Sequence, residues 1–258
     1  MQRFLPSGRR LAPQHLCAMM LVLAIGISGA RSRRTSHVGS GNKELVQISC
    51  ILPNNTHMYA HIPRVRPALD IANDYIVRHR LLPDHQLDFT YADSRCSPTY
   101  AQIEAIDFYM KGKTRAFFGP VCDYAAAAIG RINWHWDIPL LTPGALVQDF
   151  GENKTVAGAQ FPMVTRVGAS FDSMSGFVVT MMTQFGWRRV KGLYERHTNT
   201  EVMDENFCYL AMNALYAVIA RNGLPIGTDE GSTFFEMPTS QDKGDVLRNE
   251  VGVKYAGK

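Results

Sequence analysis

The 258-residue sequence lacks the short motifs by which many enzymes are recognised. It contains no G-x-S-x-G nucleophile elbow, no complete G-x-x-x-x-G-K-[ST] loop, no G-x-G-x-x-G turn and no H-E-x-x-H helix. It also has no C-x-x-C pair, and the H-x-x-x-H spacing of His57 and His61 falls before Pro63 in an expected loop. We therefore expect neither an enzyme nor a metal site.

Long hydrophobic runs are also missing. The apolar run Leu16–Ile27 is shorter than the roughly 20 residues that a membrane-spanning helix needs. Because it follows three arginines and precedes the small residues Ser28–Ala30, residues 1–30 are predicted to be a secretory signal peptide, with an uncleaved anchor as the alternative. This leader holds three of the 27 basic residues and none of the 23 acidic ones, so its removal lowers the net charge from +4 to +1. Such a weak charge does not indicate nucleic-acid binding.

Cysteine is scarce, and its use is consistent with secretion. Cys17 leaves with the leader, and residues 31–43 form a polar stretch that we predict to be a flexible tail. The sequons at Asn54 and Asn153 predict glycosylation of surface loops. Four cysteines would enter an oxidising compartment, where three disulfide pairings are open to them: Cys50, Cys96, Cys122 and Cys208.

The remaining chain alternates short β-like runs with amphipathic helical patterns, which is typical of a parallel sheet covered by helices. We predict a first βαβαβαβ lobe over residues 44–162 and the start of an incomplete second lobe over residues 163–258. The predicted strands are 45–52, 87–92, 115–118, 138–142, 163–167, 189–194 and 232–237, and the predicted helices are 64–80, 99–111, 123–134, 170–185 and 206–222.

Apolar spacing predicts the buried face of three of these helices. The residues predicted to face the core are Val65, Leu69, Ala72 and Ile76 in the first helix, Ile103, Ile106 and Met110 in the second, and Phe171, Met174, Val178 and Met181 in the helix over 170–185.

One region carries a specific string of residues. It comprises Asp93–Cys96, Gly119–Ala127 with its Cys-x-Tyr-Ala-Ala-Ala segment, and His135–Trp136, with Arg64–Ala68 upstream. This set resembles the hormone-binding ectodomain of natriuretic-peptide receptors, above all the clearance type. The resemblance covers about residues 45–237, is looser beyond Val167, and implies a two-lobed α/β fold of the type I periplasmic-binding-protein kind.

The resemblance also implies roles for individual residues. It implies a Cys96–Cys122 disulfide and a chloride ion held by the Ser94 hydroxyl and the Val121 and Cys122 amides, whereas the residues alone favour an ordinary helix start capped by Asp123. No other cofactor is expected. Residues matching Tyr124, Arg131 and Tyr194 contact the hormone in the family. Cys50 is expected to be a free core thiol, and the family partner of Cys208 is not found in this chain.

These observations predict the extracellular ligand-binding region of a peptide-hormone receptor that pairs with a second copy. The intact receptor would lie on the outer face of the plasma membrane, anchored by a segment absent from this chain, whereas a complete chain of this length would be secreted. Two alternatives stay open: a small-molecule or amino-acid-binding lobe of the same fold, and a secreted truncated decoy.

Overall fold

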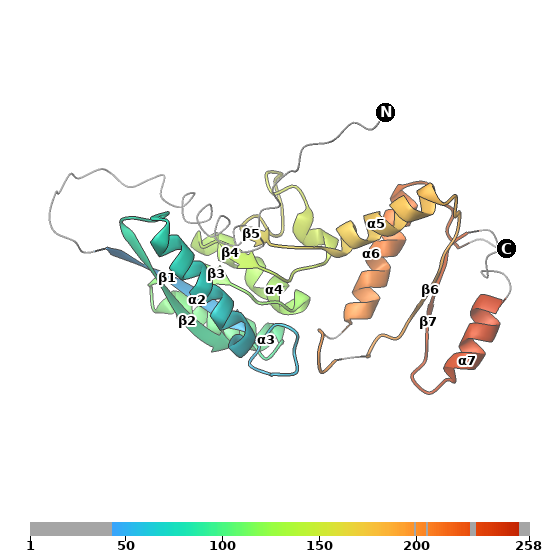
Figure 1. Ribbon diagram of the computed structural model, residues 1–258, viewed down its shortest axis with the longest axis horizontal. Coiled ribbons are helices and arrows are strands. Elements are labelled where there is room, and N and C mark those ends of the chain that lie inside the picture. Colours follow the sequence, from blue (N-terminus) through green and yellow to red (C-terminus); the bar gives the residue numbers. More distant parts are fainter. Residues whose placement is uncertain (1–42, 199, 205, 228–230, 253–258) are drawn as a thin grey trace, which may run out of the picture.

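The computed structural model describes residues 43–198, 200–204, 206–227 and 231–252, and their elements form two groups, each built on a parallel sheet (Figure 1). The predicted signal peptide, and the predicted tail except Lys43, lie outside the described residues. The first sheet has the strand order β2-β1-β3-β4-β5. Its strands are β1 (Glu44–Leu52), β2 (His85–Asp93), β3 (Thr114–Phe118), β4 (Leu140–Thr142) and β5 (Val164–Arg166).

The centre of the first sheet is apolar on both faces, as expected for a parallel sheet covered by helices. Strand β1 lies between β2 and β3, and Cys50, Ile51 and Leu52 near its end are fully buried. Cys50 is a free thiol, and burial raises its pKa to about 12. The thiol is therefore protonated at neutral pH and packs as a small apolar side chain.

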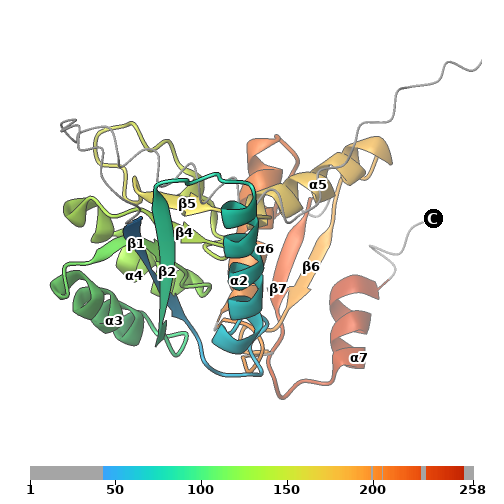
Figure 2. The same ribbon diagram turned by 60° about the vertical axis from the view of Figure 1, so that its left-hand side comes forward.

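Helices cover both faces of this sheet. Helix α2 (Ile62–Arg78) joins β1 to β2, and α3 (Pro98–Met110) leads back across β1 to β3. Because parallel crossovers are right-handed, this reversal of direction places α2 and α3 on opposite faces, as Figure 2 shows. Helix α4 (Asp123–Gly130) lies beside α3 and is followed by the 3-10 helix η1 (Asn133–Trp136), so it ends at Gly130 rather than at Trp134.

The inner face of α3 differs from the prediction. Ile103, Ile106 and Met110 are 54%, 43% and 76% exposed, and the buried residues are Ala101, Ala105 and Phe108. Small residues also make up much of the buried face of the neighbouring α4, where Ala125, Ala126 and Gly130 are buried. Because small side chains let the two helices approach closely, the larger apolar residues of α3 remain on the surface. In α2 the prediction holds for the three buried residues Leu69, Ala72 and Ile76.

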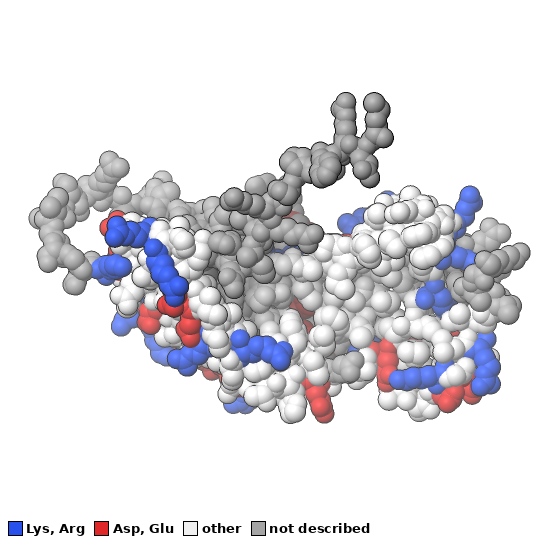
Figure 3. All heavy atoms as spheres, in the orientation of Figure 1, with Lys and Arg blue, Asp and Glu red and all other residues white. Residues whose placement is uncertain are grey.

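The second group is smaller. Strands β6 (Lys191–Tyr194) and β7 (Thr233–Glu236) pair in parallel, and helices α5 (Phe171–Gln184) and α6 (Phe207–Arg221) pack against each other. The chain then forms α7 (Lys243–Val246) and the π-helical turn η3 (Leu247–Val251), neither of which was predicted. Phe171 is buried as predicted, but Met174 is 54% exposed, and Figure 3 shows a largely uncharged surface over α5.

Strand β5 was predicted to open the second lobe, but it lies in the first sheet. Leu140, Leu141 and Thr142 of β4 pair with Val164, Thr165 and Arg166 in parallel register. The second lobe therefore begins after β5, at the Ser170 cap of α5, where Ser170 and Ser173 form a capping box.

Candidate functional site

The site is built around the N-terminus of α4, where segments of both lobes converge. Cys122 is the N-cap residue of this helix, and its sulfur forms a disulfide with Cys96 in the loop after β2, the pairing that the resemblance implied. Gly144 lies so close that a Cβ atom there would overlap the Val121 backbone. The loop after β4 therefore packs directly on the chain entering α4.

The side chain of Asp123 connects α4 to that loop. It is buried, and one carboxylate oxygen accepts hydrogen bonds from the Leu146 and Val147 amides. Burial raises its pKa to about 6, although the two amides and the nearby Arg166 guanidinium favour the charged form. Asp123 therefore anchors the loop after β4 rather than capping its own helix.

A second buried carboxylate, that of Asp204, reaches the same helix end from the segment after β6. Its Oδ2 accepts a hydrogen bond from the backbone amide of Asp123 at 2.7 Å, and its Oδ1 lies 3.8 Å from Cys96 Sγ. Nearby, the Val202 carbonyl accepts from the Tyr59 amide at 3.1 Å. The segment between β6 and α6 is thus attached to the first lobe at two points.

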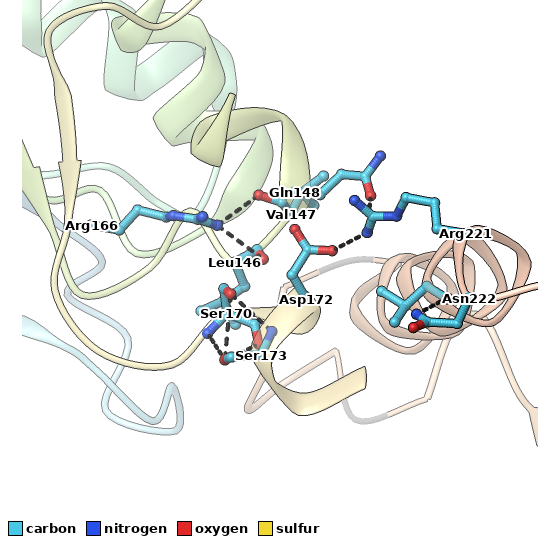
Figure 4. Close-up of polar contacts among 10 residues, drawn as sticks. Leu146, Val147, Gln148, Arg166, Ser170, Asp172, Ser173, Arg221 and Asn222 are labelled. Atoms are coloured by element: carbon cyan, nitrogen blue, oxygen red, sulfur yellow. Dashed lines mark hydrogen bonds and ion pairs between the residues drawn. The ribbon is translucent and has the colours of Figure 1, made fainter. Parts of the chain in front are cut away.

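Further polar contacts lie where the chain passes from the first lobe to the second (Figure 4). Within the first lobe, Arg166 of β5 donates to the carbonyl oxygens of Ala145 at 3.2 Å and Val147 at 2.9 Å. From the second lobe, Arg221 of α6 donates to Asp172 of α5 at 2.8 Å and to Gln148 of the first lobe at 3.4 Å. These side chains are therefore committed to holding the junction.

A cleft of about 490 Å³ opens beside Asp204, between α4 and the segment before α6. Tyr124 projects into it from the first turn of α4 and is 46% exposed. The other lining residues are Cys96, Pro98, Thr200, Met203, Asp204 and Asn206. Contributions come from both lobes, so the shape of the cleft depends on how the lobes are held.

Tyr194 lies in a smaller pocket of about 110 Å³ in the second lobe, whose aromatic lining also includes Tyr209, Tyr216 and Phe234. The Tyr194 hydroxyl donates to Glu236 at 3.2 Å, and Arg196 binds the same carboxylate through Nε and Nη2 at 2.9 and 2.8 Å. This network orients the tyrosine at the edge of the pocket. The segment before α6 thus lines the Tyr124 cleft, and α6 itself lines the Tyr194 pocket.

The other predicted site residues lie apart from these clefts. Arg131 follows α4, and its guanidinium lies 5.3 Å from the centre of the Phe161 ring. Ser94 is fully buried, and its hydroxyl accepts from the Cys96 amide at 3.3 Å. Asn54 and Asn153 are exposed, as glycan acceptors must be. Their glycosylation, and a chloride ion at Ser94, Val121 and Cys122, stay predictions.

Sequence reasoning missed Asp204. Nothing in the local pattern distinguishes it from other polar residues of the loop, because its partner, the Asp123 amide, lies 81 positions away.

The Cys96 and Cys122 sulfurs and an Asp204 oxygen lie within 4.8 Å of one another, as metal ligands would. Both sulfurs are consumed in the disulfide, however, and metal ligation by cysteine requires thiolates.

In the described part of the chain, no helix combines the length and the apolar character needed to cross a membrane.

Residues 64–249 match the protein family described as "Receptor family ligand binding region". The chain is 25% identical over 223 residues to atrial natriuretic peptide receptor 3 of Rattus norvegicus, covering 80% of this chain and 40% of that receptor. It is 27% identical over 213 residues to atrial natriuretic peptide receptor 2 of Rattus norvegicus, covering 82% of this chain and 19% of that receptor. The chain thus spans less than half the length of these relatives, and the matched family is one of ligand-binding regions rather than of catalytic domains.

Solved structures with the same architecture include bacterial binding proteins. The ABC transporter substrate-binding protein of Desulfitobacterium hafniense matches with a TM-score of 0.59 and 14% identity over 80% of this chain and 54% of its own. A periplasmic binding protein of Burkholderia mallei matches with a TM-score of 0.56 and 13% identity, over 80% of this chain and 50% of its own. The predicted periplasmic-binding-protein-like α/β fold is therefore confirmed.

Proposed function

This chain belongs to the receptor family ligand binding region, and from that premise we propose that it binds a peptide hormone on the outside of the cell. The similarity to natriuretic peptide receptors supports a peptide as the ligand. The Cys96–Cys122 disulfide and the exposed sequons at Asn54 and Asn153 support an extracellular location, because disulfides persist in oxidising compartments.

The observation that carries the proposal is a pair of tyrosine-lined hollows, one beside the segment before α6 and one along α6. Tyrosine offers a large, rigid contact surface with a polar end, which suits peptide side chains. Asn206, just before α6, lines the Tyr124 cleft, and Tyr209, three residues later in α6, lines the Tyr194 pocket. An extended ligand that follows this stretch of chain would contact both hollows.

A small-molecule function is less well supported by the arginines. An amino-acid or carboxylate ligand needs a cationic group that is open to the cleft. Arg166 is committed to backbone carbonyls, Arg196 to Glu236, and Arg221 to Asp172 and Gln148. These three guanidinium groups therefore already have protein partners.

The proposed receptor works as a homodimer, and the outer side of α3 provides a suitable surface. Ile103, Ile106 and Met110 of this helix are all more than 40% exposed. Several exposed apolar residues on one element are typical of protein–protein contacts. Replacing Ile103 and Ile106 with aspartate should convert a dimer to a monomer in sedimentation velocity, and an unchanged sedimentation coefficient would remove this face from the proposal.

Calorimetric titration of the secreted protein with ring-closed peptide hormones tests the main proposal. We expect saturable binding that Tyr124→Ala and Tyr194→Ala each weaken by roughly 10- to 100-fold, the usual range for an aromatic anchor. Tyr100→Ala is the matched control, because Tyr100 is 41% exposed but lines neither hollow. Binding of free amino acids without any peptide binding would overturn the proposal in favour of a small-molecule receptor.

A further inference from the structure

We propose that the Asp204 carboxylate serves as a built-in anion at the N-terminus of α4, in place of a free chloride ion, and thereby positions the wall of the Tyr124 cleft. The inference concerns how the lobes are held and does not require a peptide ligand. It rests on two features of the described residues: the contact of Asp204 with α4, and the attachment of its segment to the first lobe.

The first feature is the placement of a buried carboxylate where an anion is favoured. Asp204 is only 6% exposed, and its Oδ2 lies 2.7 Å from the first backbone amide of α4. A helix N-terminus presents free N–H groups and the positive end of the helix dipole, both of which stabilise a negative charge. Burying a carboxylate is costly without such partners. The helix end therefore supplies the compensation that the Asp204 charge needs.

The same position cannot readily accept a second anion. Of the predicted chloride ligands, Val121 and Cys122 directly precede this helix end, and the Ser94 hydroxyl accepts from the Cys96 amide. Asp204 Oδ1 lies 3.8 Å from the Sγ of Cys96, which the disulfide joins to Cys122. A chloride ion there would lie against the Asp204 carboxylate in a poorly solvated site, where like charges repel strongly. Asp123, the next carboxyl group, faces away toward the Leu146 and Val147 amides.

The second feature is what this contact holds in place. Asp204 and Val202 attach the segment before α6 to Asp123 and Tyr59 of the first lobe. Thr200, Met203 and Asn206 of the same segment form one wall of the cleft, and Tyr124 forms the facing wall. Asp204 is thus a positioning residue: without its carboxylate, this wall loses its attachment to α4.

A chloride titration tests the inference on the whole secreted chain. Thermal unfolding is followed in sodium gluconate progressively replaced by sodium chloride up to about 0.15 M total salt, so that ionic strength stays constant. We expect the midpoint of the wild-type protein not to change with chloride. A saturable rise of the wild-type midpoint would overturn the inference, because it would reveal a free anion site.

Variants of Asp204 give the complementary result. Asp204→Ala should lower the unfolding midpoint by roughly 3–8 °C through loss of a buried hydrogen-bonded partner, and chloride should restore part of that loss by entering the vacated position. Asp204→Asn keeps the shape but not the charge, should fold if the alanine variant does not, and should also gain a chloride response. Glu201→Ala, on the same segment but exposed, is the control and should show neither effect. Absence of any chloride response in both Asp204 variants would overturn the assignment of an anion position.

Peptide titrations on the same variants separate this inference from the proposed function. If the chloride results are as expected but no peptide binds the wild-type chain, Asp204 still holds the lobes and only the peptide proposal fails. If peptide binds but wild-type stability follows chloride, the peptide proposal stands and the role of Asp204 fails.

Discussion

The two lobes differ in how completely each buries its own core. The first has five parallel strands with helices on both faces and a continuous apolar core from Val46 to Val164. Among its described residues the second has two strands, and its separate apolar cluster is built on the buried residues Val179, Met182, Val218 and Ile219. Because two strands cannot bury enough apolar surface to be stable alone, the described part of the second lobe depends on its contacts with the first.

Defined polar contacts join the two lobes. Asp204, Arg221 and the Phe171 amide, which donates to the Leu146 carbonyl at 2.9 Å, each reach from the second lobe to a defined partner in the first. The buried Phe171 ring packs edge-on against Phe207 within the second lobe. The contacts that cross between the lobes therefore fix their relative orientation through a few defined polar partners.

Equivalent core truncations in the two lobes should unfold different parts of the protein. Phe117→Ala in β3, at a fully buried position, should lower the free energy of unfolding by about 4 kcal/mol and release both lobes. Ile219→Ala in α6, also fully buried, should cost about 3 kcal/mol and release the second lobe alone. Native-state hydrogen exchange distinguishes the two. Equal loss of protection in β1 for both variants would mean that the lobes unfold as one unit, and Val156→Ala, at an exposed position, is the control.

Removing the disulfide should weaken the first lobe selectively. Cys96→Ser combined with Cys122→Ser opens a loop with a sequence separation of 26 residues and should cost about 3.5 kcal/mol by the loop-entropy estimate. Urea denaturation measures this cost. Cys208→Ser, a free and half-buried cysteine of the second lobe, should change stability by roughly 1 kcal/mol or less. A larger effect at Cys208 than at the disulfide would reverse the ranking of the lobes.

Asp123 should make the stability of the first lobe depend on pH. Its pKa is raised from 3.8 to about 6 in the folded protein, mainly by burial, so the folded state binds this proton more tightly than the unfolded state. The contribution of this group to the free energy of unfolding is therefore largest below pH 3.8, the unfolded pKa. It falls by about 3 kcal/mol as the pH rises from there through the folded pKa of about 6.

Asp123→Asn removes the titrating group, keeps an oxygen that can accept from Leu146 and Val147, and should flatten the profile between pH 4 and 6. Asp70→Asn on the exposed side of α2 is the control. An unchanged slope in the Asp123 variant would contradict the assignment of the pH dependence to this group.

The smallest effect is expected on the outer surface of α5. Phe177 is 64% exposed, so Phe177→Ser should change the free energy of unfolding by only about 0.5 kcal/mol. Val179→Ser, two positions along at 7% exposure, should cost several times more. A large cost at Phe177 would show that this uncharged surface is covered in the protein as purified (Figure 3).

The helix faces show where sequence reasoning succeeded and failed. In α2, the apolar period identified Leu69, Ala72 and Ile76, because this helix covers the sheet with one apolar stripe. In α3, the same reasoning selected the larger residues Ile103 and Ile106, whereas close packing against α4 buries alanines. Apolar spacing shows which side chains of a helix can be buried. How closely the neighbouring helix packs decides which of them are buried.

The sequence by itself determined the alternation of strands and helices, the parallel sheets and the resemblance to natriuretic-peptide receptors, because these depend on local periodicity and on a contiguous string of residues. Only the tertiary structure decided that β5 joins the first sheet and that Asp204 reaches the N-terminus of α4. The physical reason is that both features are contacts between segments far apart in the chain. A three-residue strand or a single loop aspartate carries no local pattern that specifies its partner, and the partner is chosen only when the two lobes pack.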